Sequence, residues 1–159
     1  MSTEKSELDR PHTWVLPPAP YALALLAAWW LKRQGHALPL DLGPAARPLA
    51  WLLVTAGLGL FVWTLYTFWR HHTTVNPYKA VAELCTGGPF AFSRNPIYVG
   101  DWLIYLGLAA GLGSFWPLVF APLVWAIIRV GVIRHEEAHL EAKFGDAYRA
   151  YKARVRRWL

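Results

Sequence analysis

The sequence predicts an all-helical integral membrane protein, with about four transmembrane helices and a C-terminal amphipathic helix in the cytoplasm. Apolar residues make up 55% of the 159 residues and charged residues only 16%, against about 25% charged residues in an average soluble domain. The 16 Lys and Arg outnumber the 10 Asp and Glu, and 10 residues are Trp. A basic, Trp-rich and strongly apolar chain is typical of a protein in contact with a bilayer rather than with nucleic acid.

The first expected span follows a short polar tail. Residues 1–12 carry both signs of charge and no apolar core, so we expect them to be solvated. Residues 13–31 contain no charged residue over 19 positions, close to the roughly 20 that a span needs. Three prolines, Pro17, Pro18 and Pro20, should confine the helix to the later part of this stretch, because proline is tolerated in a first helical turn but not further in.

The second expected span, residues 48–69, is the clearest. It has 22 residues without a charge, and an α-helix of that length covers about 33 Å, enough to cross a bilayer. Pro48 is suited to its first turn. Trp51 and Trp69 are placed to lie at the two membrane interfaces, where tryptophan is enriched.

The last two expected spans form a tight hairpin. The chain has no charge over 27 residues from Trp102 to Ile128, but the run GLGSFWP from Gly111 to Pro117 interrupts this stretch with turn-forming residues. We therefore expect one helix over about 97–112 and another over 117–133.

The distribution of basic residues predicts the orientation of these four spans. Four spans would place twelve Lys and Arg on the side that holds both termini and the 70–96 loop, and three on the other side. Because basic residues are enriched in cytoplasmic segments, both termini should be cytoplasmic, in the cytoplasmic (inner) membrane. Residues 13–159 then form a single domain whose polar chemistry comes from the 70–96 loop and the tail, 134–159.

The tail has the pattern of an amphipathic helix that is broken near Gly145. Its apolar residues recur at helical spacing on one stripe: Leu140, Phe144, Tyr148, Tyr151 and Val155. One interpretation is a helix that lies on anionic lipid, because the tail has seven basic and four acidic residues.

The segment His135-Glu136-Glu137-Ala138-His139 matches H-E-x-x-H, in which two histidines one helical turn apart bind zinc and a glutamate activates water. No third ligand is evident downstream, although His71 and His72 could supply one from the loop. A membrane zinc metallopeptidase is therefore one alternative function, and a non-catalytic helical membrane protein is another.

The most informative loop segment runs from Cys85 to Gly100. Gly87 and Gly88 permit a close backbone approach or a positive φ, and Pro96 favours an extended Asn95 before a new helix begins. Three groups capable of binding or chemistry follow the turn: Arg94, Asn95 and Tyr98. Asp101 adds an ionisable group inside the third span, where a functional role and a simple pairing with Arg94 or Arg129 are both open.

Two blocks of the sequence resemble the small membrane methyltransferases, which include isoprenylcysteine carboxyl methyltransferase and the phospholipid N-methyltransferases. The resemblance covers about residues 70–158 and rests on matching order and spacing. The matching residues are Gly88-Pro89-Phe90, Arg94-Asn95-Pro96-Ile97-Tyr98-Val99-Gly100, Glu136-Glu137, Leu140, Phe144-Gly145, Tyr148, Tyr151 and Arg154-Val155.

The resemblance implies a transferase that binds S-adenosylmethionine between the loop and the tail, needs no metal, and methylates a lipophilic acceptor, a lipid or a prenylated peptide, that arrives from the bilayer. The cofactor-binding residues that it implies are Ala82, Glu83, Leu84, Cys85, Phe90, Asn95, Pro96, Ile97, Tyr98 and Glu136. The sequence also departs from the prenylcysteine enzymes: Asn95 stands in place of a histidine and Asp101 in place of an aromatic residue, and Val132 takes the place of an arginine. These differences concern the acceptor more than the cofactor.

The chemistry of these side chains is consistent with that assignment. S-adenosylmethionine is cationic, so the Glu136 carboxylate could hold its ammonium or ribose, while Tyr98 and Phe90 offer aromatic faces. A carboxylate acceptor would need alignment rather than a general base. We assign that role to Arg94 as the catalytic side chain, because a guanidinium can bind an anionic group through two parallel hydrogen bonds.

Overall fold

The structure, a computed structural model, describes residues 15–71 and 84–159. These residues form helices and no strand, with one isolated β-bridge between Pro39 and Ser114. The α-helices are α2 (Ala19–Arg33), α3 (Ala46–Arg70), α4 (Pro96–Leu112), α5 (Trp116–Ile128), α6 (Arg134–Phe144) and α7 (Asp146–Arg154). Two short 3₁₀ turns, η1 (Gly43–Ala45) and η2 (Gly88–Ala91), and a π-helical segment, η3 (Arg129–Ile133), complete the described fold.

The helices form where the uncharged stretches predict them. The second predicted span, 48–69, lies within α3, and the predicted hairpin helices correspond to α4 and to α5 with η3. Helix α2 begins at Ala19, directly after Pro18, as the prolines predict, and is only 15 residues long.

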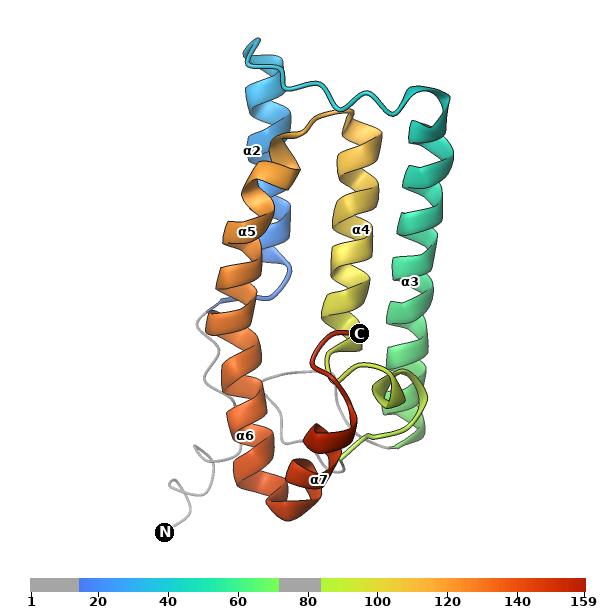
Figure 1. Cartoon of the computed structure of the whole chain (residues 1–159), viewed down its shortest axis with the longest axis vertical. Coiled ribbons are helices and arrows are strands. Elements are labelled where there is room, and N and C mark those ends of the chain that lie inside the picture. Colours follow the sequence, from blue (N-terminus) through green and yellow to red (C-terminus); the bar gives the residue numbers. More distant parts are fainter. Residues whose placement is uncertain (1–14, 72–83) are drawn as a thin grey trace.

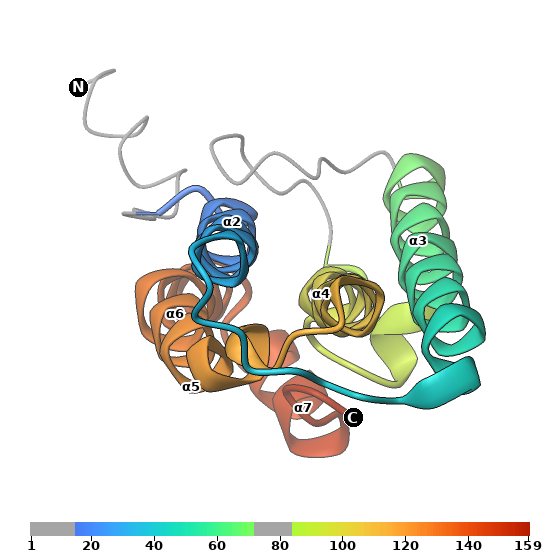
Figure 2. The same ribbon diagram turned by 90° about the horizontal axis from the view of Figure 1, so that it is seen from above.

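Glycines allow α3 and α4 to pack closely along their length. A Cβ atom added at Gly57 would lie 2.6 Å from the carbonyl oxygen of Gly100, and one at Gly107 would lie 2.9 Å from the carbonyl oxygen of Ala50. Only glycine permits such an approach of two helix backbones. Figures 1 and 2 place α4 between α3 on one side and α2 with α5 on the other.

The last long helix runs through α5, η3 and α6 without interruption, from Trp116 to Phe144. It follows a tight turn at Gly113, whose φ of +60° favours glycine. The 34–45 connection meets this turn, because the amide of Phe115 donates to the carbonyl of Leu38 at 2.7 Å. The two connections therefore share one end of the bundle (Figure 1).

Among the residues that the structure describes, two helices are long and apolar enough to cross a membrane, Gly43–Arg70 and Trp116–Phe144, and Pro96–Leu112 is a shorter apolar helix. Only 11% of the apolar 18-residue stretch within Gly43–Arg70 is buried inside the protein. A soluble core helix would bury most of such a surface, whereas a bilayer accommodates it exposed.

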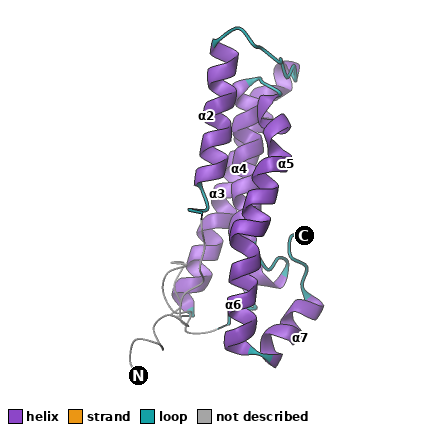
Figure 3. Ribbon diagram, turned by 90° about the vertical axis from the view of Figure 1, so that its left-hand side faces the viewer, coloured by secondary structure: helices purple, strands orange, loops and turns teal. Residues whose placement is uncertain are grey.

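The tail folds back at the other end of the bundle, where α6, α7 and η2 gather (Figures 1 and 3). The break predicted near Gly145 is confirmed, since this residue has φ +52° and separates α6 from α7. Tyr148 and Tyr151 of the tail stripe are buried with Cys85 and Phe90 of the loop, and Leu140, Phe144 and Val155 are partly buried against them.

Candidate functional site

The acid pair at the start of α6 faces two different neighbours. Consecutive residues of an α-helix point about 100° apart, so the side chains of Glu136 and Glu137 leave the helix in different directions. The hydroxyl of Tyr98, in the first turn of α4, donates a 2.8 Å hydrogen bond to Oε1 of Glu136. Glu137 instead binds two arginines, Arg94 and Arg157. The pair therefore divides between a tyrosine and an ion cluster.

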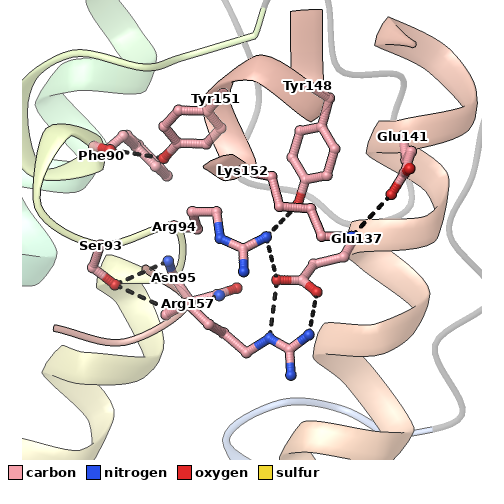
Figure 4. Close-up of polar contacts among 10 residues, drawn as sticks. All are labelled: Phe90, Ser93, Arg94, Asn95, Glu137, Glu141, Tyr148, Tyr151, Lys152 and Arg157. Atoms are coloured by element: carbon pink, nitrogen blue, oxygen red, sulfur yellow. Dashed lines mark hydrogen bonds and ion pairs between the residues drawn. The ribbon is translucent and has the colours of Figure 1, made fainter. Parts of the chain in front are cut away.

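Glu137 forms an ion cluster with Arg94, from the loop before α4, and with Arg157, from the end of the tail (Figure 4). Nη1 of Arg94 lies 3.0 Å from Oε1 of Glu137, and Arg157 donates through Nε at 3.0 Å and Nη2 at 2.5 Å to the two carboxylate oxygens. The side chains of Arg94 and Glu137 are 9% and 8% exposed, and that of Arg157 is 26% exposed. Buried charges are tolerated only when paired, so Glu137 offsets two guanidinium groups and leaves the cluster with one net positive charge.

The end of the tail runs alongside the segment that precedes α4. At Val155 the chain turns from helical to extended, with φ −118° and ψ 130°. The carbonyl of Arg156 accepts from the amide of Arg94 at 3.0 Å, and the carbonyl of Arg157 accepts from Nδ2 of Asn95 at 3.0 Å. The side-chain amide of Asn95 is thus directed at the tail.

Aromatic residues of α7 close the cluster from another side. The hydroxyl of Tyr151 donates to the carbonyl of Phe90 at 2.7 Å, and Nη1 of Arg94 donates to the hydroxyl of Tyr148 at 3.5 Å. Tyr148 and Tyr151 form an apolar core with Cys85 and Phe90. This core fixes the glycine turn against the tail.

Burial changes the acid strength of groups at this site. Burial raises the pKa of Glu136 to about 7, which Glu137 reinforces, although the hydrogen bond from Tyr98 opposes the change. Burial, followed by the charge of Glu137, raises the pKa of Tyr148 to about 12. Glu136 therefore titrates near neutral pH, and Tyr148 stays protonated there.

The structure brings together most of the predicted site residues that it describes. Ala82 and Glu83 lie outside the described residues. Leu84, Cys85 and Phe90 contact the tail, Asn95 and Pro96 are buried at the start of α4, and Tyr98 meets Glu136. Ile97, in the first turn of α4, is half-buried. Their proposed roles toward a cofactor stay predictions.

The sequence reasoning missed two members of the cluster. It named the acid pair but gave a role to Glu136 alone, although the helical spacing of consecutive residues indicates different partners for Glu137. The sequence marks Arg157 only as a departure from the family pattern, in which a proline follows Arg-Val, and its pairing with Glu137 depends on the turn of the chain at Val155.

The simple pairing considered for Asp101 is wrong for both candidate arginines. Arg94 pairs with Glu137, and the guanidinium of Arg129 lies 4.6 Å from the centroid of the Trp125 ring.

The H-E-x-x-H segment lies at the start of α6. Across residues 15–71 and 84–159, no three or more His, Cys, Asp or Glu side chains are grouped so that they could hold a metal ion. Glu136, the general base of the zinc interpretation, accepts its hydrogen bond from Tyr98. His72, one of the considered ligands, lies outside the described residues.

Comparisons with known proteins point to one family. A family profile described as phospholipid methyltransferase matches residues 46–147, from α3 into α7, and so includes Arg94, Tyr98 and the acid pair. Over 73 residues, 45% of this chain, the sequence is 37% identical to Protein-S-isoprenylcysteine O-methyltransferase of Schizosaccharomyces pombe. That match spans only 30% of the length of the relative.

A second relative is an uncharacterized protein of Haemophilus influenzae. It is 40% identical over 63 residues, which are 40% of this chain and the whole of that protein. No solved structure matches the chain.

Proposed function

This chain belongs to the phospholipid methyltransferase family, and on that premise we propose that it transfers a methyl group from S-adenosylmethionine to a lipophilic acceptor. The observation that carries the proposal is the contact between Tyr98 and Glu136. It joins the two sequence blocks on which the family resemblance rests, although they lie far apart in the chain. The S. pombe relative, named as a methyltransferase, supports the same reaction class.

The described residues fit a cationic methyl donor. S-adenosylmethionine supplies an activated methyl group on a positively charged sulfur. Glu136 offers a carboxylate for the ammonium or the ribose hydroxyls, and Tyr98 and Phe90 offer aromatic faces. Nε of Arg94 is buried without a hydrogen-bond partner in the described part of the chain, so a donor remains at this site for a ligand to satisfy.

The remaining cofactor contacts are proposed for the segments on either side of the glycine turn. Ala82 to Cys85 would lie on one side, and Asn95, Pro96 and Ile97 on the other. Gly88 itself packs on α3, since an added Cβ would lie 2.8 Å from Oγ1 of Thr67. We therefore assign Gly88 to the shape of the turn and not to ligand contact.

Arg94 is our candidate for holding the acceptor. The cluster of Arg94, Glu137 and Arg157 keeps one uncompensated positive charge, which favours an acceptor with an anionic group. Arg94 is also held by Glu137 and Tyr148, so its guanidinium has a fixed orientation. Enforced alignment of reacting groups can supply about 7 to 11 kcal/mol of a displacement barrier.

We propose that four helices cross the membrane: α2, α3, α4, and α5 with η3. In this arrangement α6, α7 and the loop before α4 lie on the cytoplasmic side, because twelve of the basic residues fall there. Reporter tags at residues 1 and 159 should both be cytoplasmic, and a tag between Gly113 and Trp116 should lie on the opposite face. Termini on opposite faces would contradict the four-span arrangement.

Calorimetric titration of S-adenosylmethionine into the purified protein tests the cofactor part of the proposal. Saturable binding is the expected result. A folded protein that does not bind this compound would contradict the proposal and favour a non-catalytic membrane protein.

A further inference from the structure

We propose that an apolar groove at the end of the bundle away from the acid pair binds an anionic phospholipid. One acyl chain would lie along α4, and the phosphate would lie among three basic side chains at the end of the groove. The proposal concerns neither the acceptor nor the methyl donor, so it does not rest on the proposed function.

The groove is built by the end of α2, the start of α3 and the end of α4. Its volume of about 560 Å³ lies within the range of roughly 300 to 1,000 Å³ for small-molecule sites. Two glycines of α4, Gly107 and Gly111, contribute to its lining and leave room between the helices. The other lining residues are apolar, apart from Arg47: Leu25, Leu26, Trp29, Ala50, Trp51, Val54, Leu108 and Leu112.

Three basic side chains, Arg47, Lys32 and Arg33, lie on or next to residues that line the groove. Arg47 lines the groove and is exposed. Nζ of Lys32 donates to the carbonyl of Leu112 at 2.5 Å, and the guanidinium of Arg33 lies 5.0 Å from the Trp29 ring centroid. Leu112 and Trp29 are themselves groove residues.

The charge balance at this end favours an anionic headgroup. Residues 32–47 contain these three basic residues and one acid, Asp41, whose Oδ1 accepts from the amide of Gly43. Lysine and arginine form strong, charge-assisted hydrogen bonds with phosphate oxygens, so these side chains suit a lipid phosphate. An acyl chain matches the apolar part of the groove, so one phospholipid satisfies both features.

A second copy of the chain fits the groove less well. In a two-fold interface the same surface patch meets itself, which would bring two sets of three cations together. The helix ends that line the groove lie at the far end of the bundle from α6 and α7 (Figures 1 and 3), so a lipid there is separate from the proposed methyl-transfer site.

Native mass spectrometry of the full-length, delipidated protein tests the headgroup preference. Phosphatidylglycerol is the anionic probe, because it has no amine, carboxyl or thiol to be methylated, and phosphatidylcholine is the zwitterionic probe. We expect tighter binding of phosphatidylglycerol, and about a fivefold loss of its affinity in Arg47→Ala, with phosphatidylcholine unchanged. Arg70→Ala is the matched control, since Arg70 lies at the opposite end of the same helix. Equal affinity for the two lipids, or an equal loss in both variants, would overturn the proposal.

A second pair of variants tests the acyl chain. Gly111 tolerates a Cβ, which would lie 3.7 Å from Cβ of Ala50, so Gly111→Leu should fill the groove and reduce binding of both lipids. Gly59→Leu is the control, because no atom lies within 4 Å of its added Cβ. Circular dichroism checks whether both variants fold. If Gly111→Leu does not fold, the comparison of Arg47→Ala with Arg70→Ala decides the proposal. Unchanged lipid binding in folded Gly111→Leu would overturn it, and a simultaneous change from dimer to monomer would identify a second copy as the occupant.

Discussion

The hydroxyl of Tyr98 donates a hydrogen bond of 2.8 Å to Oε1 of Glu136, 38 residues further along the chain. The next residue, Glu137, turns away from Tyr98 and binds Arg94 and Arg157. The acid pair therefore has two separate roles: Glu137 holds the loop and the tail together, and Glu136 accepts its hydrogen bond from Tyr98 within residues 15–71 and 84–159. This division makes the two glutamates separable by mutation.

Glu136→Ala should weaken binding of S-adenosylmethionine by about 1.5 to 3 kcal/mol, or roughly 10- to 150-fold, the scale of one charge-assisted hydrogen bond. Calorimetric titration measures the change. Glu141→Ala is the control, since Glu141 lies on the same helix and pairs with Lys152 near the surface. If the folded Glu136→Ala protein bound like the parent, the cofactor pocket would have to lie elsewhere.

The affinity for S-adenosylmethionine should rise between about pH 6 and pH 8. Burial raises the pKa of Glu136 from 4.5 to about 7, so its carboxylate forms only as the pH passes through neutrality. The contribution of Glu136 to folding stability has the opposite trend: it is fully present below pH 4.5 and is lost as the pH rises through 7, because the fold favours the neutral form. Titrations at several pH values in the parent and in Glu136→Gln check the binding trend, which the variant should lack. An identical pH profile in both proteins would remove Glu136 from the explanation.

Glu137→Ala should destabilise the protein by about 3 to 5 kcal/mol, because it leaves two guanidinium groups without their shared carboxylate. Glu141→Ala should cost less than about 1 kcal/mol, since the side chains of Lys152 and Glu141 are 42% and 35% exposed and their pair is screened by solvent. Thermal unfolding in detergent compares the two variants. Similar losses of stability in both would mean that the buried cluster is no more important than a surface ion pair.

Gly57→Ala should lower stability by about 1 to 3 kcal/mol, because the new Cβ would lie 2.6 Å from the carbonyl oxygen of Gly100. Gly59→Ala, two residues later on α3, meets no atom within 4 Å and should be neutral or slightly stabilising. Thermal unfolding of both variants tests whether α3 and α4 approach as closely as described. The prediction fails if Gly57→Ala is as stable as Gly59→Ala.

The helices could be predicted from the sequence because their signals are local. Uncharged stretches and turn-forming residues predicted α3 and the α4–α5 hairpin, with helix boundaries that differ from the structure by a few residues. Gly145 marked the break in the tail. The π-helical segment Arg129–Ile133 was not predicted, since a change in backbone hydrogen bonding leaves no distinct pattern of residues.

The partners of the site residues could be predicted only in part. The family resemblance implied that the loop and the tail form one site, and Tyr98 does meet Glu136. The pairing of Arg157 with Glu137 depends on a change of backbone direction at Val155. The pattern of the apolar tail stripe is equally consistent with contact to lipid and with contact to Cys85 and Phe90, so the pattern alone does not identify the partner. Such contacts are set by the tertiary fold.

Transfer of a labelled methyl group from S-adenosylmethionine into membrane extracts tests the central claim most directly. We expect the parent to label a lipid or prenylated-peptide fraction. Glu136→Ala should lose labelling at low donor concentration, and Arg94→Ala should lose turnover more than donor affinity. Arg94→Ala should still fold, because Arg157 continues to neutralise Glu137, and Arg94→Lys should rescue poorly because lysine lacks the planar fork. Absence of label in every lipophilic fraction, from a folded parent that binds the donor, would contradict the account.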